Sequence, residues 1–572
     1  MFFTKSGSPE PSPISANRTS LEYDIWNNYS PKNDRLVDAT FEAMVGTEYA
    51  DECEVTYTYD DLGRVTNINR PVDNGKGNLA YEYDIHGWID NISSNSFKEQ
   101  LHYNDGDGTP LFSGNISSVS WSNGSTPNRG YKYTYDSLNR LVNAEYGENH
   151  FSTGNGNFNE SVSYDSNGNI KTLVRNGQIQ GNTYGAIDNL EISYNGNQPY
   201  AVNEKASPVL YSYSLDVKDS SIDIRYNSNG SLVNDGTRGI TNIAYDDNNN
   251  PVRIQFDNGN VTKYIYSATG QKLRAIHYTA MDNIHIDTGC DYEDIEDDYL
   301  AVDSTDYLCG GMILYTNAKP SKILFDGGYI DVSYVKRNAQ RPRRTSGMTD
   351  EEYLAILERW RAYIAERTTL GYRFYNKDHL GNIREVIDED GDVCQKTDYY
   401  PFGTPFSSET YAINAAYQPY KYNGKEFDMM HGLNTYDYGA RQYHPLLPLW
   451  DRVDPLAEKY YSTSPYGYCL GNPVNNIDPD GRIVETLWDA ANVTLDIASC
   501  TSNLTNGNFL SAAVDAGALL IDVAATAMPF VPGGAGTAVK AFRRANTFKA
   551  NIKAGKEFER SIINTAKKEG RD

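Results

Sequence analysis

Residues Tyr57–Val65 read YTYDDLGRV, and this pattern returns along the first half of the chain. In each copy an aromatic-rich segment is followed by Asp or Asn, one or two variable residues, Gly or Asn, and a second short segment. Asp and Asn bond their own backbone in turns and Gly tolerates positive φ, so each copy predicts a β-hairpin. The further copies are Tyr81–Ile89, Tyr133–Leu141, Ser163–Ile170, Tyr226–Leu232, Tyr245–Val252 and Tyr264–Leu273.

The spacing of these copies predicts a sheet that grows by stacking hairpins. Tyrosines at positions 59, 83, 103, 135, 164, 194, 226, 245 and 266 lie 19 to 32 residues apart. One hairpin cannot bury a core, so the units must pair edge to edge into a continuous sheet. The excess of Tyr (46) over Phe (18) suits half-buried strands, because the tyrosine ring is apolar and its tip is polar. We expect the turn aspartates to be structural rather than catalytic.

Composition and charge exclude several kinds of site. The net charge of −25 argues against nucleic-acid binding by the shell. The six Cys and eight His are dispersed without metal-ligand spacing, so no metal and no cofactor are expected, although a Cys290–Cys309 pair stays open. No apolar run of signal-peptide length begins the chain, and we expect a fragment of a longer reading frame.

A basic stretch and a predicted helix interrupt the repeats. Residues 336–347 read KRNAQRPRRTSG, and Thr349–Thr368 carries apolar residues at helical spacing. Thr349 and Glu352 have the spacing of a capping box, which marks the start of a helix. We expect a surface-loop insertion whose helix packs on the sheet, and a helix that binds a partner stays open as the alternative.

From Tyr372 the chain becomes dense in Asp, Gly and Pro. Its motifs, in order, are Asp378-His379-Leu380-Gly381-Asn382, Tyr400-Pro401-Phe402-Gly403, Gly439-Ala440-Arg441-Gln442-Tyr443, Asp454-Pro455-Leu456, Asn472-Pro473 and Asp478-Pro479-Asp480-Gly481. In the order and spacing of these motifs the segment resembles, over about 110 residues, the core domain of bacterial RHS/YD-repeat proteins, and the upstream Tyr-Asp hairpins fit the same family.

The resemblance implies a mainly β fold in which a spiral, cocoon-like repeat shell is closed by a core-domain plug. A small α-helical C-terminal segment follows the plug. The expected domains are an N-terminal segment (1–54), the β-repeat shell (55–335), the basic loop and helical insertion (336–370), the core domain (371–482), an apolar helical linker (483–540) and the basic start of an effector (541–572).

The resemblance also implies a site. In some family members the core domain is an aspartic self-protease that cuts shortly after the last Asp-Pro-x-Gly, and Asp454 and Asp478 match its catalytic pair. Two carboxylates that share a site keep a proton between them, so Asp454 is expected as general base and Asp478 as its partner. Arg441 matches the family's arginine, which would bind the scissile carbonyl or orient a carboxylate. Cleavage would fall near Arg482–Ile483, with Gly481, Arg482 and Ile483 as the cleavage-site residues.

Two departures from the family pattern keep an uncut, purely structural plug open as the alternative. Arg482 stands where many cleaving members have Leu or another apolar residue, and Pro448-Leu449-Trp450 replaces a Gly-Arg-aromatic motif. Asp-Pro-Asp-Gly is also an ordinary turn sequence.

The C-terminal segment differs from the shell in charge. From Lys540 to Asp572 there are ten Lys or Arg and four Asp or Glu, which predicts either a solvated basic helix or the start of a domain that handles acidic partners. Gly555–Glu559 resembles the first helix of restriction-endonuclease-like toxin domains, but no Asp…Glu-x-Lys motif follows.

The expected function is a shell that encapsulates or presents a variable C-terminal effector and releases it by self-cleavage. The alternative is a cell-surface adhesion or carbohydrate- and protein-binding repeat protein without catalysis. The expected partners are the chain's own C-terminal segment and, beyond it, a secretion apparatus, a cognate immunity protein or a cell-surface ligand. The family implies a secreted or cell-surface location.

Overall fold

The computed structural model describes residues 21–29, 35–45, 48–124, 128–207, 217, 224–281, 284–287, 299–336, 339–345, 348–364, 367–406, 414, 417–459, 461–482 and 484–486. Over these residues the fold is mainly β, as the repeats predict, with a single α-helix. No helix within these ranges has the length and apolar character needed to span a membrane.

The strands of the shell follow one another in sequence order. They form a sheet of 14 strands and a sheet of 13, and neighbouring strands are antiparallel. The first sheet contains β1 (Leu21–Tyr29), β2 (Leu36–Val45), β3 (Glu48–Tyr59), β4 (Val65–Asn69), β5 (Leu79–Tyr83), β6 (Ile89–Ser93), β7 (Phe97–His102), β8 (Ser118–Asn123), β9 (Arg129–Tyr135), β10 (Leu141–Glu148), β11 (Glu160–Tyr164), β12 (Ile170–Gln180), β13 (Thr183–Asn195) and β14 (Gln198–Glu204).

The second sheet continues the same meander and runs past the expected end of the shell into the stretch expected as core domain. Its members are β15 (Ile224–Tyr226), β16 (Leu232–Asp235), β17 (Ile240–Tyr245), β18 (Pro251–Phe256), β19 (Val261–Tyr266), β20 (Lys272–Ala280), β21 (Tyr299–Leu308), β22 (Ile313–Thr316), β23 (Lys319–Phe325), β24 (Gly328–Val335), β25 (Arg367–Lys377), β26 (Ile383–Ile387) and β27 (Val393–Lys396).

The turn aspartates are structural, as expected. Asp165 Oδ1 accepts the backbone N–H groups of Asn167 and Asn169 at 2.8 and 3.0 Å. The fourth turn position needs a left-handed backbone, which Gly168 supplies here (φ 85°) and Asn139 supplies in an earlier copy (φ 61°). Local chemistry therefore accounts for the Asp-x-x-Gly part of the repeat.

In seven of the nine repeats counted in the sequence, and in two later hairpins, a tyrosine ties its hairpin to the one before. Its hydroxyl donates to a backbone carbonyl at the start of the preceding strand, over distances of 2.6 to 3.0 Å. Phenylalanine fills the same space but leaves that carbonyl unbonded, which explains the excess of Tyr. The donor–acceptor pairs are Tyr59–Leu36, Tyr83–Val65, Tyr103–Ile89, Tyr135–Ile116, Tyr164–Leu141, Tyr194–Ile170, Tyr245–Leu232, Tyr334–Pro320 and Tyr399–Ile383.

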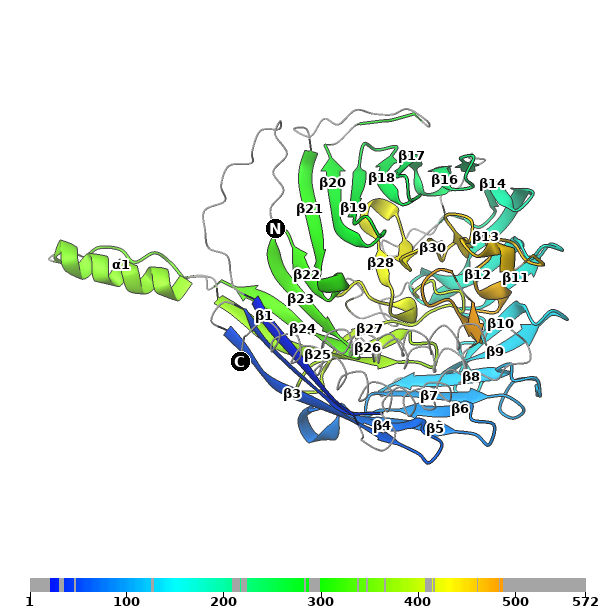
Figure 1. Ribbon diagram of the computed structural model, residues 1–572, viewed down its shortest axis with the longest axis horizontal. Helices are drawn as coiled ribbons and strands as arrows, with labels where there is room; N and C mark the ends of the chain where they lie inside the picture. Colours follow the sequence, from blue (N-terminus) through cyan, green and yellow to red (C-terminus); the bar gives the residue numbers. More distant parts are fainter. Residues whose placement is uncertain are drawn as a thin grey trace, which may run out of the picture.

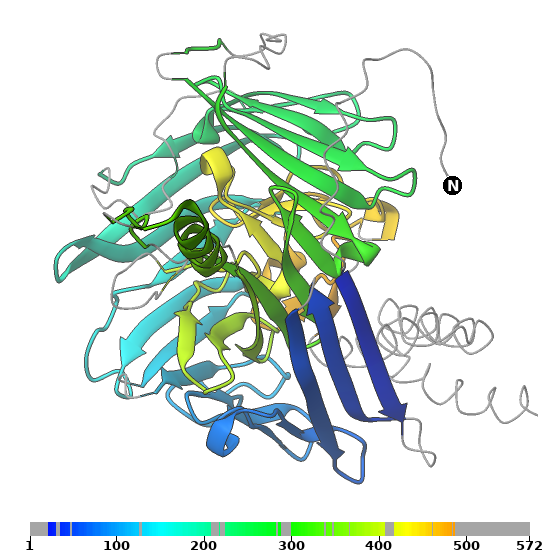
Figure 2. The same cartoon turned by 90° about the vertical axis from the view of Figure 1, so that its left-hand side faces the viewer.

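The two sheets curve around the segment that follows β27, which is drawn yellow to orange between them in Figures 1 and 2. The last strands return beside the first. Tyr372 donates its hydroxyl to the Phe41 carbonyl at 2.9 Å, and Arg70 donates to the Tyr375 carbonyl at 2.8 Å. No backbone ladder joins these strands within the described ranges, so the shell is not a closed barrel.

The segment after β27 is the plug, which we define as residues 397–482. It contains a small sheet of β28 (Glu426–Asp428), β29 (Thr435–Asp437), β30 (Gln442–His444) and β31 (Leu449–Trp450), and β32 (Asn476–Ile477) pairs with β33 (Glu485–Thr486). One buried apolar cluster joins both sheets to the plug. Its plug members include Tyr400, Phe402, Tyr422, Tyr436, Tyr443, Trp450 and Tyr468.

The insertion after β24 contains α1 (Asp350–Ile364), which begins with the predicted capping box. The Thr349 N–H donates to Glu352 at 2.9 Å, and the Glu352 N–H donates to the Thr349 hydroxyl at 3.2 Å. The expectation that this helix packs on the sheet is wrong, because α1 projects away from the body (Figure 1). Its aromatic side chains bond the insertion's own basic stretch instead, Tyr353 to the Pro342 carbonyl and Trp360 to the Ala339 carbonyl.

The tyrosine tie leads to a stability prediction. Tyr194→Phe removes the hydroxyl that reaches the Ile170 carbonyl at 2.8 Å and leaves that carbonyl unbonded. We expect a loss of about 1 kcal/mol in the free energy of unfolding, measured by urea denaturation. Tyr461, which is 87% exposed, provides the matched control, and Tyr461→Phe should leave the free energy unchanged. Equal effects of the two substitutions would contradict the tie.

Candidate active site

The structure brings the three residues predicted for catalysis together around one guanidinium group. Arg441 lies just before β30, Asp454 follows β31 and Asp478 follows β32. Arg441 Nη2 lies 3.0 Å from Asp454 Oδ2 and 3.0 Å from Asp478 Oδ2, so a single nitrogen binds both carboxylates. The three side chains are buried, and the Arg441 guanidinium lies 4.2 Å from the centre of the Trp450 ring.

The same arginine reaches the backbone where cleavage is expected. Arg441 Nε donates to the Gly481 carbonyl oxygen at 2.5 Å, which is the carbonyl of the Gly481–Arg482 peptide bond. The N–H of that peptide bond donates to Asp478 Oδ1 at 2.9 Å. Both ends of one peptide group are therefore held by predicted site residues. Ile483 lies outside the described residues.

The plug holds the Asp478–Gly481 turn from several sides. Lys425 Nζ donates to the Pro479 carbonyl at 2.6 Å, and the Ala440 N–H donates to the Asp480 carbonyl at 3.2 Å. Gly481 has φ 79°, and a Cβ at this position would lie 3.1 Å from the Arg441 backbone nitrogen. Glycine is thus required both by the left-handed backbone and by the close approach to Arg441.

Burial shifts the titration of this cluster. It raises the pKa of Asp478 to about 6, although Arg441 and the backbone donors act in the opposite direction. Burial also raises the pKa of Asp454, again against Arg441, and it lowers the pKa of the Arg441 guanidinium. Since both carboxyl groups titrate above their ordinary range, one of them can hold a proton while the other is ionised.

Solvent reaches the cluster through an open pocket of about 790 Å³. The shell contributes the turns between β17 and β18 and between β19 and β20, at residues 248–250 and 268–271. The plug contributes Asp454, Asp480 and Arg482, among others, and the side chains of Asp480 and Arg482 are 57% and 55% exposed. Water therefore has access to Asp454, whereas Asp478 is fully buried.

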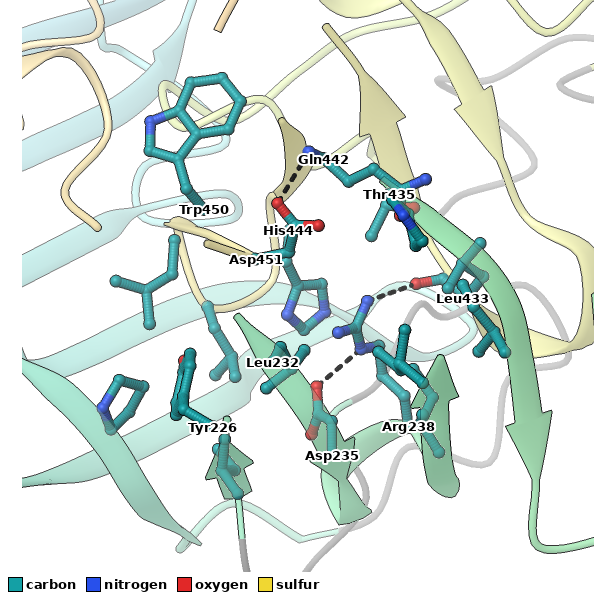
Figure 3. Close-up of a pocket in the computed structure, with 18 of the residues that line it drawn as sticks. Tyr226, Leu232, Asp235, Arg238, Leu433, Thr435, Gln442, His444, Trp450 and Asp451 are labelled. Atoms are coloured by element: carbon teal, nitrogen blue, oxygen red, sulfur yellow. Dashed lines mark hydrogen bonds and ion pairs between the residues drawn. The ribbon is translucent and has the colours of Figure 1, made fainter. Parts of the chain in front are cut away.

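A second cavity lies at the seam between shell and plug (Figure 3). There Arg238 of the shell binds Asp235 at 2.7 Å and donates to the Leu433 carbonyl of the plug at 3.1 Å. The cavity has a volume of about 30 Å³, enough for no more than a few water molecules. The cavity marks where the plug packs against the shell, and it is too small to hold a substrate.

Other buried charges fix the plug in the same manner. Arg175 of β12 is fully buried, binds Glu160 and Asp188 at 2.7 and 2.8 Å, and donates to the plug carbonyls of Pro445 and Leu446. Asp398 at the start of the plug accepts from Arg129 of β9, from Arg384 of β26 and, at 3.0 Å, from the Trp121 indole. Because one unpaired partner in such a site is costly, these contacts specify how the plug sits.

The sequence did not point to Asp480, Lys425 or Trp450 as members of this cluster. Asp480 occupies the variable position of the Asp-Pro-x-Gly turn, Lys425 lies outside the quoted motifs, and Trp450 ends the altered Pro448-Leu449-Trp450 motif. Only the turn motif gave a signal, since it fixed Asp480 beside Asp478. Within the described residues no group of His, Cys, Asp and Glu could hold a metal ion.

The architecture defines a class of protein, an antiparallel repeat shell filled by a charged and aromatic plug. No family model matches the chain. Over 118 residues it is 41% identical to salivary gland surface protein 1 of Aedes aegypti, covering 20% of this chain and 3% of that protein. It is 31% identical over 126 residues to the tRNA nuclease WapA of Bacillus subtilis, covering 22% and 5%, and 26% identical over 184 residues to the tRNA3(Ser)-specific nuclease WapA of Bacillus spizizenii, covering 32% and 7%.

Two solved structures match most of this chain at low similarity. The crystal structure of TcdB2-TccC3 without its hypervariable C-terminal region matches with a TM-score of 0.49 and 15% identity, over 80% of this chain and 21% of that chain. The Photorhabdus luminescens Tc holotoxin pore matches with a TM-score of 0.43 and 15% identity, over 80% and 23%. This chain thus spans only a small part of the curated relatives and about a fifth of the solved chains. The two WapA relatives agree, at a coarse level, with the RHS-type, toxin-related resemblance of the motifs.

The raised pKa of Asp478 has a measurable consequence for stability. Because the folded state holds a proton that the unfolded state loses, this contribution to stability is complete below about pH 4 and is lost as the pH rises through about 6. Asparagine cannot ionise, so the Asp478→Asn variant does not lose this stability as the pH rises. From pH 4 to pH 7 the free energy of unfolding of Asp478→Asn should rise, relative to wild type, by up to about 3 kcal/mol, measured by urea denaturation. A difference that does not change with pH would contradict this assignment.

Proposed function

We propose that this protein is an RHS-type shell that carries or presents its own C-terminal segment and cuts itself between Gly481 and Arg482. The observation that supports this proposal best is the position of Arg441. One guanidinium group binds two buried carboxylates and the carbonyl oxygen of a peptide bond that follows the last Asp-Pro-x-Gly turn.

In the proposed reaction Asp454 is the general base, because it is the carboxylate that lines the solvent-open pocket. It takes a proton from a water molecule, whose oxygen forms a bond to the Gly481 carbonyl carbon. Negative charge then develops on the carbonyl oxygen, where Arg441 Nε already donates at 2.5 Å.

Asp478 completes the reaction as general acid. Its carboxyl group already contacts the Arg482 nitrogen at 2.9 Å, and its raised pKa keeps it protonated in mildly acidic solution. As the bond between the Gly481 carbon and the Arg482 nitrogen breaks, Asp478 gives its proton to that nitrogen. The products are a Gly481 carboxyl group and an Arg482 amino group, and the proton that Asp454 took from water restores the pair.

The segment after the cut is proposed to be an effector. The two WapA relatives are named as tRNA nucleases, and the basic segment Lys540–Asp572 suits an acidic partner, whereas the shell is strongly acidic. Residues 487–572 lie outside the described ranges, so the activity of this segment is a proposal from the sequence and the relatives alone.

Self-cleavage is tested by gel electrophoresis and by mass spectrometry of the new N-terminus. We expect wild-type protein to yield fragments that end at Gly481 and begin at Arg482. Asp454→Asn keeps the shape of the side chain but removes the base, so the cut should slow by at least about 100-fold. Asp165→Asn, at a turn of the shell, is the matched control and should cut like wild type. If wild type, Asp454→Asn and Asp165→Asn all remain uncut, the proposed self-cleavage is wrong.

The pH dependence of the cut tests the roles of the two carboxyl groups. Because Asp478 must be protonated to act as acid, the first-order rate of cleavage should fall about tenfold for each pH unit above about 6. Toward low pH the rate should also fall, because Asp454 becomes protonated and can no longer accept a proton. Protein recovered uncut under denaturing conditions and then refolded allows the rate to be followed from pH 4 to pH 9. A rate that rises steadily toward alkaline pH would contradict this assignment.

A further inference from the structure

The groups that hold the Gly481–Arg482 peptide bond carry full charges, although the bond itself is neutral. Arg441, a cation, contacts the carbonyl oxygen at 2.5 Å. Two carboxylates accept the N–H of Arg482, Asp478 Oδ1 at 2.9 Å and Asp480 Oδ1 at 3.1 Å. The Arg482 side chain adds a cation near Asp480, with Nε 3.9 Å from Asp480 Oδ2.

Hydrolysis would create charge at these two positions. Water adds its oxygen to the Gly481 carbon, the carbon–nitrogen bond breaks, and near neutral pH the products are a Gly481 carboxylate and an Arg482 α-ammonium. The carboxylate arises against Arg441, and the ammonium arises between Asp478 and Asp480. Hydrogen bonds in which only the site residue is charged thus become ion pairs between opposite charges, which are stronger.

We propose that the cut site binds both of its own products, the Gly481 carboxylate on Arg441 and the Arg482 α-ammonium between Asp478 and Asp480. This inference rests on the proposed self-cleavage. The nicked chain then stays joined at this point by charge, and cutting alone does not release the C-terminal segment. Release needs a further change, such as protonation of the two aspartates or separation of shell and plug.

The surroundings of the cut support retention of the carboxylate half. The turn that ends in Gly481 is held by Lys425 on the Pro479 carbonyl and by the Ala440 N–H on the Asp480 carbonyl, and neither contact involves the bond that breaks. The turn therefore keeps its place after hydrolysis. Arg441 is itself fixed by Asp454 and by the Pro465 carbonyl, at 3.0 and 3.2 Å.

The ammonium half is open to reagents. Arg482 and Asp480 line the pocket of about 790 Å³, and both side chains are more than half exposed. A small amine-reactive molecule can thus reach the new N-terminus of the native, cut protein. A free α-amino group has an ordinary pKa near 8, and two adjacent carboxylates favour its charged, unreactive form.

The test is the labelling rate of the Arg482 α-amine. Cut wild-type protein is treated with acetic anhydride at pH 7.5, either native or unfolded in guanidinium chloride, and the N-terminal Arg482 peptide is quantified by mass spectrometry. The native rate is expected to be at least about tenfold below the unfolded rate. Asp480→Asn should raise the native rate several-fold, measured on the fraction of chains that is cut, while Asp165→Asn should leave it unchanged.

Each other outcome overturns the inference. Equal native and unfolded rates mean that the new terminus is free. A slow native rate that persists in Asp480→Asn means that burial, not charge, protects the amine. A new N-terminus at Ile483 means that the next peptide bond is cut, and the contacts of Arg441, Asp478 and Asp480 to the Gly481–Arg482 bond then do not hold the products. If no new terminus forms in any sample, the proposed self-cleavage fails and this inference fails with it.

Discussion

Most hairpins of the shell are tied to the previous one by a tyrosine hydroxyl that donates to a backbone carbonyl. This bond adds to the ladder, because the burial of one face sets the register of a strand and the tyrosine fixes which strand start its own hairpin contacts. The tyrosine hydroxyl oxygen lies 2.6 to 3.0 Å from a carbonyl oxygen at the start of the preceding strand, and this bond holds the tyrosine ring against that strand. The sheet therefore grows with a fixed register and presents its apolar residues on one face.

A sheet with one apolar face needs something to cover that face, and the plug does so. Aromatic residues fill the interior, and buried arginines decide where the plug sits, since each binds carboxylates or carbonyls from two parts of the chain. Arg175 joins β11, β12 and β13 to the Pro445 carbonyl, and Arg238 joins Asp235 to the Leu433 carbonyl. Arg441 follows the same rule within the plug, except that one of its carboxylate partners, Asp454, lines a pocket open to solvent.

That difference separates a structural arginine from a candidate catalytic one. Arg175 is sealed on all sides, so its carboxylates can only pair. Arg441 binds one fully buried carboxylate and one that lines an open pocket, which gives the two aspartates unequal environments. Unequal environments are what acid and base roles require. The uncut, structural plug remains the competing explanation, because Asp478 also caps its own turn through the Gly481 N–H at 2.8 Å.

The sequence predicted what depends on neighbouring residues. Turns such as Asp165–Asn169 and the capping box of Thr349 and Glu352 follow from local chemistry, and both form. The carbonyl that accepts the hydrogen bond of a repeat tyrosine lies 13 to 24 residues before it in the chain. The repeat pattern therefore identified the tyrosines but did not predict these hydrogen bonds. The packing of α1 was wrongly predicted, since an amphipathic pattern does not say which surface it covers. Arg441, Asp454 and Asp478 came from the resemblance, whereas the contact to Gly481 required coordinates.

In the proposed mechanism, water activated between Asp454 and Asp478 breaks the Gly481–Arg482 bond. Cleavage carried out in water enriched in oxygen-18 tests this mechanism most directly. One oxygen-18 atom is expected in the carboxyl group of Gly481 and none elsewhere in the new C-terminal peptide. A labelled carboxyl group at Asp454 or Asp478, the mark of simple acid cleavage at an Asp-Pro bond, would contradict the mechanism, as would an unlabelled Gly481.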